Sequence, residues 1–119
     1  MFNFEKLEVW RKSLDFAAKV YRTTSAFPSD ERFGLTNQLR RASVSISSNL
    51  AEGSSRSSKP DYARFVELAS GSLFEVVSQC HIAKQQEFLA ITDFNSLYAD
   101  AEELSRMLSG LRTYLTSNS

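Results

Sequence analysis

The chain has 119 residues, the size of one ordinary domain, with 42% hydrophobic and 24% charged residues, which excludes a disordered chain. Its 14 basic and 14 acidic residues balance, so it lacks the strong positive charge of a nonspecific nucleic-acid binder. The charge is uneven, because residues 1–64 hold 11 basic and 7 acidic residues (net +4) and residues 65–119 hold 3 and 7 (net −4).

Two features bear on the cellular setting. The single cysteine, Cys80, excludes an intramolecular disulfide and lies in an apolar stretch, so we expect a buried thiol. Glu5 and Lys6 interrupt the apolar N-terminus before a secretory signal core can form, and no apolar run reaches membrane-spanning length. We therefore expect a cytoplasmic protein.

The apolar spacing predicts a first helix over residues 5–25 and a second over residues 30–54. Pro28 ends the first helix, and either Ser29 or Asp30 can cap the second. The first helix carries a core-facing stripe that alternates three- and four-residue steps, made of Leu7, Trp10, Leu14, Ala17 and Tyr21.

The third helix is predicted over residues 59–88 with Ser58 as its cap, and the fourth over residues 93–116 with Thr92 as its cap. Four amphipathic helices joined by short loops predict an all-α, antiparallel up-down-up-down four-helix bundle. We expect residues 1–119 to form this single domain.

The second helix contains a polar position in its apolar seam. The seam of Leu35, Leu39, Ala42 and Ile46 leads to Asn49, and a buried polar group must find partners. We expect Asn49 to fix the helix register and Glu52 to be a salt-bridge partner or a hydrogen-bond acceptor at the helix end. The alternative is that both belong to a polar site near one end of the bundle.

The short loops also allow contact predictions between helices. They place Arg40 opposite Glu75, and Asp15 near Arg41, so we expect both arginines in structural ion pairs. A phosphate clamp is the alternative for this pair of arginines.

No motif indicates catalysis. His81 is the only histidine, which excludes a multi-histidine metal site, so a structural or surface role is expected, with contact to a partner as the alternative. No nucleophile elbow, phosphate-binding loop or EF-hand pattern occurs. We expect a non-enzymatic protein without catalytic residues, cofactor or metal.

Basic residues offer a candidate nucleic-acid contact. Arg56, Lys59 and Arg64 cluster near the second loop, and phosphate contacts require only positioned cations. Lys12 and Lys19 of the first helix are further candidates for the same role.

Apolar residues exceed what a solitary bundle needs, because one stripe per helix is sufficient for its core. The surplus predicts subunit contacts between copies of the chain, with a wider core stripe as the alternative. The surplus residues are Val9, Phe16 and Val20 in the first helix and Phe74, Val77 and Phe88 in the third.

Several motifs resemble one family over nearly the whole chain. They are Leu-Arg-Arg-Ala at 39–42, Ser-Ile at 45–46, Asn-Leu-Ala-Glu-Gly at 49–53 and Gly-Ser-Leu at 71–73. The chain with these motifs resembles the 23S ribosomal RNA intervening-sequence proteins. That resemblance implies a bacterial, cytosolic, all-helical protein that assembles into a ring-like homopentamer.

A similar bundle serves diversity-generating retroelements as a basic pentamer that binds nucleic acid and a reverse transcriptase, and this neutral chain departs from it in charge. We expect a homo-oligomeric, pentameric binding or scaffold protein that contacts structured RNA or a ribonucleoprotein. The alternative is a protein–protein interaction adaptor without nucleic-acid binding.

Overall fold

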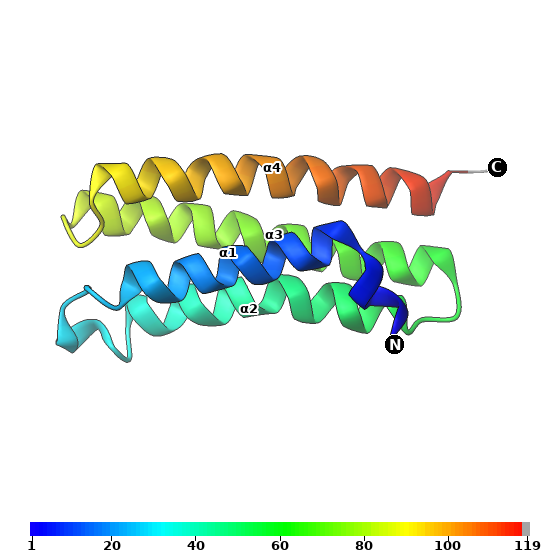
Figure 1. Cartoon of the computed structure of the whole chain (residues 1–119), viewed down its shortest axis with the longest axis horizontal. Helices are drawn as coiled ribbons and strands as arrows, with labels where there is room; N and C mark the ends of the chain where they lie inside the picture. The colour runs from blue at the N-terminus through cyan, green and yellow to red at the C-terminus, as the bar shows by residue number, and fades with distance from the viewer. Residues whose placement is uncertain (118–119) are drawn as a thin grey trace.

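The computed structural model describes residues 1–117 and contains four α-helices and no strand in that range. Helix α1 spans Glu8–Thr24, α2 Leu35–Ser54, α3 Lys59–Gln85 and α4 Ile91–Thr116. The four helices lie side by side in a rod of 48 × 22 × 21 Å (Figure 1). The predicted all-α class and its four helices are confirmed.

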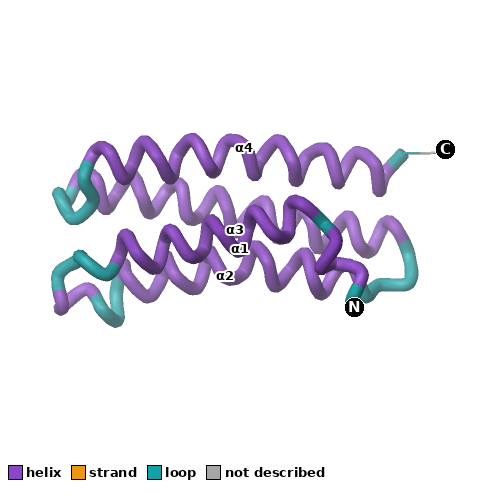
Figure 2. The backbone as a smooth tube through the Cα atoms, viewed as in Figure 1, coloured by secondary structure: helices purple, strands orange, loops and turns teal. Residues whose placement is uncertain are grey.

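The helices occupy the four corners of the rod, and neighbours in sequence run in opposite directions (Figure 2). Helix α1 contacts α2 and α4, and α3 also contacts α2 and α4. Within residues 1–117 no Cα atom of α1 lies within 8 Å of one in α3, and none of α2 lies within 8 Å of one in α4. The α1–α2 side and the α3–α4 side are therefore opposite faces of the rod.

The loop before α2 differs from its prediction. Helix α2 begins at Leu35 rather than at residue 30, because Ser29–Glu31 forms a separate 3-10 turn. The Glu31 side chain then accepts a hydrogen bond from the Leu35 amide at 3.1 Å, which satisfies one of the free amides of the first helical turn.

The ends of α3 are only partly as predicted. Ser58 caps α3, since its hydroxyl accepts the Asp61 amide at 3.2 Å. Helix α3 ends at Gln85, short of residue 88, and Glu87 adopts a left-handed backbone with φ 63° in the turn that follows. Helix α4 begins earlier than predicted, so Ala90 and not Thr92 is its N-cap.

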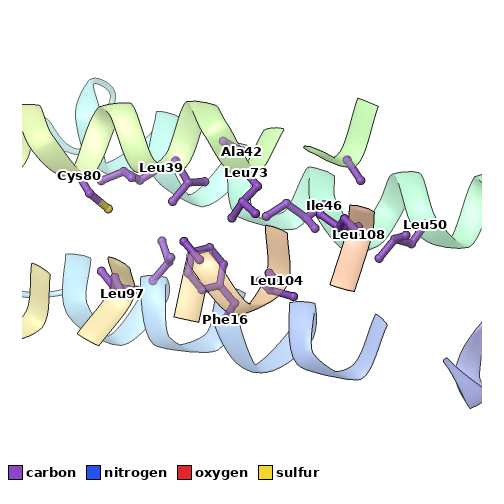
Figure 3. Packing of buried hydrophobic residues seen from close by; sticks show 14 of the residues in the cluster. Phe16, Leu39, Ala42, Ile46, Leu50, Leu73, Cys80, Leu97, Leu104 and Leu108 are labelled. Atoms are coloured by element: carbon purple, nitrogen blue, oxygen red, sulfur yellow. The ribbon is translucent and has the colours of Figure 1, made fainter. Parts of the chain in front are cut away.

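One apolar cluster fills the space between the four helices (Figure 3). Its members come from all four helices, and Cys80 is buried among them as predicted. The largest side chains that are at most 2% exposed include Leu39, Ile46 and Leu50 of α2, Leu73 of α3, and Leu104 and Leu108 of α4.

The core-facing side of α1 is only partly the predicted one, since Ala17 is buried and Leu7 and Trp10 pack against the core as expected. Val9, Phe16 and Val20 are buried in the core of the chain, whereas Leu14 is 42% and Tyr21 is 44% exposed. The prediction that Val9, Phe16 and Val20 form a subunit interface is therefore wrong. The alternative, in which these residues widen the core stripe, applies to this helix. The buried side of α1 is rotated from the predicted stripe toward these three residues.

Two polar residues share the buried side of α1. Ser13 donates a hydrogen bond to the Trp10 carbonyl at 2.6 Å, and Thr24 donates one to the Val20 carbonyl at 2.8 Å. Both hydroxyls are satisfied by their own helix, so their burial leaves no unpaired donor. This back-bonding allows the rotated stripe to face the core.

Helices α2 and α3 approach closely at Gly53. A Cβ atom added there would lie 2.7 Å from the Cβ of Phe65 and 2.9 Å from Cδ1 of Tyr62. Any side chain at this position would displace α3, so the glycine is what allows the contact.

Candidate functional site

The structure brings Arg56, Lys59 and Arg64 to the end of the rod where α2 meets α3, together with two carboxylates. Arg56 lies 3.2 Å from the Glu52 carboxylate and 3.9 Å from that of Asp61, and Arg64 lies 3.1 Å from Asp61. These acidic neighbours neutralise much of the positive charge that the sequence places there.

Aromatic rings hold the same three cations in place. The guanidinium groups of Arg56 and Arg64 lie 4.5 and 4.6 Å from the ring centre of Phe65. The Lys59 ammonium lies 5.0 Å from the ring centre of Tyr114 and pairs with no carboxylate within residues 1–117. These contacts stabilise the end of the bundle, and the nucleic-acid contact stays a prediction.

The other two predicted cations brace α1 against α4. Lys12 lies 2.6 Å from the Glu103 carboxylate, and this hydrogen bond raises the pKa of Lys12 above its usual value. Lys19 lies 2.5 Å from Asp100 and donates a second hydrogen bond to Ser96 at 2.7 Å. Both lysines therefore join helices, on the α1–α4 side of the rod.

The predicted contacts of Arg40 and Glu75 are wrong. Arg40 turns toward α1, where it donates to the Thr24 hydroxyl at 2.9 Å and to the Tyr21 carbonyl at 3.3 Å, and its guanidinium lies over the Tyr21 ring at 4.6 Å. Glu75 instead accepts a hydrogen bond from Gln79 at 3.2 Å. Arg40 of α2 therefore faces α1, whereas Glu75 pairs within α3, and the two do not meet.

The other polar residues singled out in the sequence have mixed outcomes. Asp15 and Arg41 are exposed, and no ion pair connects them in the part of the chain that the structure describes. Asn49 is half-buried beside the seam and donates to the carbonyl and the hydroxyl of Ser45, at 2.8 and 3.0 Å. Glu52 is a salt-bridge partner, as expected, through Arg56.

The predicted interface residues of α3 have separate locations. Phe74 is 66% exposed on the α3–α4 side of the rod, and Val77 is half-buried beside it. Phe88 packs against Phe27 with ring centres 6.0 Å apart, at the end of the rod that holds the first loop. Phe74 and Val77 are thus available to a partner, whereas Phe88 closes the end of the core.

A shallow apolar groove runs between α3 and α4. Its volume is about 250 Å³, and Glu102 is the carboxylate at its edge. We refer to it as the α3–α4 face, which is lined by Leu73, Phe74, Val77, Tyr98, Ala101, Glu102 and Ser105.

The opposite side of the rod has an apolar surface that the sequence analysis missed. We refer to it as the α1–α2 face, and it consists of Leu14, Tyr21, Arg40 and Val44. Leu14 precedes Tyr21 by two helical turns, and Val44 follows Arg40 by one, so each pair shares one side of its helix. Val44 is an apolar residue outside the apolar seam of α2, and this position could have revealed the surface from the sequence.

Isolated reactive groups occupy no site. Burial raises the pKa of the Cys80 thiol to about 11 and also raises the pKa of Tyr62. His81 is exposed and packs its edge against Phe94, with ring centres 4.9 Å apart. Among residues 1–117 no group of three or more His, Cys, Asp or Glu side chains could hold a metal ion, and no helix could cross a membrane.

Four long helices around one apolar core, with charged side chains used mainly to brace helices, define the class of small four-helix bundle proteins. Within that class, the family model for the 23S rRNA-intervening sequence protein matches residues 5–110. The chain therefore belongs to the 23S rRNA-intervening sequence protein family, and the resemblance noted in its motifs is confirmed.

A solved structure supports the same fold. It is a protein with unknown function from the S23 ribosomal protein family of Bacteroides thetaiotaomicron, similar with a TM-score of 0.78 and 20% sequence identity. The match covers 92% of this chain and 99% of the other. Comparison with curated proteins finds no match. Neither similarity names a reaction.

Proposed function

We propose that this protein is a non-enzymatic scaffold that self-assembles in the cytoplasm and presents the surface of the assembly to another macromolecule. The observation that carries the proposal is the exposure of large apolar side chains outside a complete core. Phe74 is 66% exposed, and Leu14 and Tyr98 are 42% and 41% exposed.

Association of copies would remove this surface from water. Burial of apolar area is the main favourable term in most protein association, and contiguous apolar patches on small proteins commonly mark interaction sites. The patches lie on two opposite faces, so each copy can contact two others. The family resemblance supports a finer proposal, an assembly of five copies.

Measurement of the mass in solution tests the proposal. We expect light scattering after size exclusion, and native mass spectrometry, to give a multiple of the 13.4 kDa chain at micromolar concentration, with five as the expected multiple. A chain that stays monomeric at 100 micromolar would contradict self-assembly, and a different multiple would contradict only the pentamer.

Contact with structured RNA is the second part of the proposal. The observation that favours it is Lys59, a cation without a carboxylate partner in residues 1–117, beside Arg56 and Arg64. We expect binding at low salt that weakens steeply as salt rises, and that falls when these three residues become Ala.

Replacing the exposed Arg106 of α4 by Ala is the matched control and should change RNA binding little. Binding that is undetectable at low salt, or unchanged in the triple variant, would favour the adaptor alternative. That alternative predicts a protein partner that is recovered after nuclease treatment.

A further inference from the structure

We infer that the two apolar faces are the two halves of one head-to-tail contact, in which the α1–α2 face of one copy packs into the groove of the α3–α4 face of the next. Arg40 of the first copy pairs with Glu102 of the second. This inference rests on the proposed self-assembly and adds to it the surfaces, their pairing and their symmetry.

The two faces differ in shape. The α3–α4 face is hollowed, with a groove of about 250 Å³ whose walls are mostly apolar. The α1–α2 face exposes Leu14 and Tyr21 two helical turns apart, with Val44 on the neighbouring helix. Side chains that project from one face can fill the hollow of the other, whereas two hollowed faces would leave a void between them.

The two faces also carry opposite charges. Three contacts with α1 fix the Arg40 guanidinium, two as hydrogen bonds and one over the Tyr21 ring, yet no carboxylate pairs with it in residues 1–117. Glu102 is exposed at the groove and has no basic partner in the same range. A guanidinium that is already positioned binds a carboxylate well, because little side-chain freedom is lost.

A hydrogen bond between helices shows that Arg40 and the groove lie near the same height along the rod. Gln79 of α3 donates to Gln38 of α2 at 3.3 Å, so Val77 is level with Arg40 in this antiparallel pair. The groove that Val77 lines therefore lies at the height of Arg40, on the opposite side of the rod.

A salt bridge gives the same result for the other two helices. Lys19 of α1 lies 2.5 Å from Asp100 of α4, so Tyr21 is level with the stretch of α4 that begins at Tyr98. Two complementary faces at equal height on opposite sides can pair by rotation without a shift along the rod. A head-to-tail contact without a shift closes into a ring when the rotation between neighbouring copies is a whole fraction of a turn, whereas a shift gives an open filament.

The test uses one exposed substitution on each face of the full chain. Leu14→Glu disables the α1–α2 face, and Phe74→Glu disables the α3–α4 face. We expect each variant alone to be a folded monomer by circular dichroism and mass. Mixed in equal amounts, they should form a one-to-one dimer, because each supplies the face that the other lacks. Leu68→Glu, at a residue 46% exposed between the two faces on the α2–α3 side, is the matched control and should assemble like the unmodified chain.

The charge pair has its own test. Glu102→Arg should weaken assembly by at least tenfold, and adding Arg40→Glu to the same chain should restore it. Restoration also shows that the double variant folds. Loss of assembly in the double variant overturns the pairing of these two residues.

The possible failures are distinct. A monomeric unmodified chain overturns both self-assembly and this contact. An unmodified chain that assembles while both Leu14→Glu and Phe74→Glu still assemble overturns the contact and leaves self-assembly standing. If the mixed variants give no dimer of the two chains, the head-to-tail arrangement is wrong. A dimer formed by either variant alone would mean that its intact face pairs with itself, which also overturns the arrangement.

Discussion

The α2–α3 and α1–α4 interfaces lie on opposite sides of the rod and are built in different ways. At the α2–α3 interface the helices approach so closely that a Cβ atom at Gly53 would not fit. The Ser72 hydroxyl also donates a hydrogen bond to the Ser45 hydroxyl there, at 2.9 Å. At the second, Lys12 and Lys19 reach across to carboxylates of α4, and hollows of about 230 and 340 Å³ remain along the seam.

The difference shows which interface tolerates change. Close contact between small residues is sensitive to any added atom, because packed helices cannot move apart without losing many other contacts. Half-exposed ion pairs contribute little and can be removed at small cost. We therefore expect the stability of the bundle to depend on α2–α3 much more than on α1–α4.

The largest expected effect comes from adding one methyl group to α2. Gly53→Ala should lower the free energy of unfolding by about 3 kcal/mol, because the new Cβ overlaps Phe65 and Tyr62. Urea unfolding followed by circular dichroism measures it.

Gly110→Ala in α4 is the matched control. A Cβ at Gly110 would meet no atom within 4 Å, so we expect unchanged stability or a gain of up to about 1 kcal/mol from better helix propensity. Equal effects of the two substitutions would mean that α2–α3 is not the closely packed interface.

The helices were predicted well because their apolar periodicity and their capping and helix-breaking residues are local features of the sequence. Ser58 is the cap of α3, as expected, and the apolar residues that α3 and α4 bury lie within the two ranges predicted to be helical. The close approach of α3 to Gly53 was not predicted, because nothing local reveals that another helix passes within contact distance.

The core-facing side of α1 could not be predicted from periodicity alone. The stripe through Leu14 and Tyr21 and the stripe through Phe16 and Val20 have equal helical spacing, so each is a valid amphipathic face. The choice between them depends on tertiary packing. The polar Ser13 makes the side that is buried look less apolar in the sequence than the side that is exposed.

The ion-pair predictions failed for a geometric reason. The register that puts Arg40 opposite Glu75 also puts Ser43 opposite Ser72, whereas Ser72 bonds Ser45, two residues further along α2. Two residues correspond to about 200° of rotation on a helix, which moves a side chain to the other side. Arg40 accordingly faces α1, away from Glu75.

The second largest effect tests whether the core behind the α1–α4 interface is dry. Cys80 faces Phe16 and Leu97 there (Figure 3), and burial raises the pKa of its thiol from 9.0 to about 11. The unfolded chain therefore loses this proton at a lower pH than the folded chain does. Stability should be unaffected below pH 9 and fall as pH rises, by about 2 kcal/mol near pH 10.5.

Cys80→Ala isolates this effect from every other contribution to the pH dependence of stability. The fall in unfolding free energy between pH 8 and about pH 10.5 should be smaller in the variant by the same amount. Identical pH profiles would mean that the Cys80 thiol is not held in a dry core.

A smaller effect concerns the polar contact of the α2–α3 interface. Ser45→Ala removes the acceptor shared by Ser72 and Asn49, and we expect a loss of about 1 kcal/mol in unfolding free energy. Ser48→Ala, at an exposed position of the same helix, should leave stability nearly unchanged. A neutral Ser45→Ala would assign the close approach to packing alone.

The smallest expected effect separates the two interfaces most directly. In a double-mutant cycle with Lys19→Ala and Asp100→Ala, the coupling energy should lie between about 0.2 and 1 kcal/mol, because the side chains are 30% and 40% exposed. Raising the salt from 0.05 to 0.5 M should reduce the coupling, since exposed charges are screened. A coupling several times larger that resists salt would mean that α4 is held to α1 by charge as firmly as α2 is held to α3 by contact.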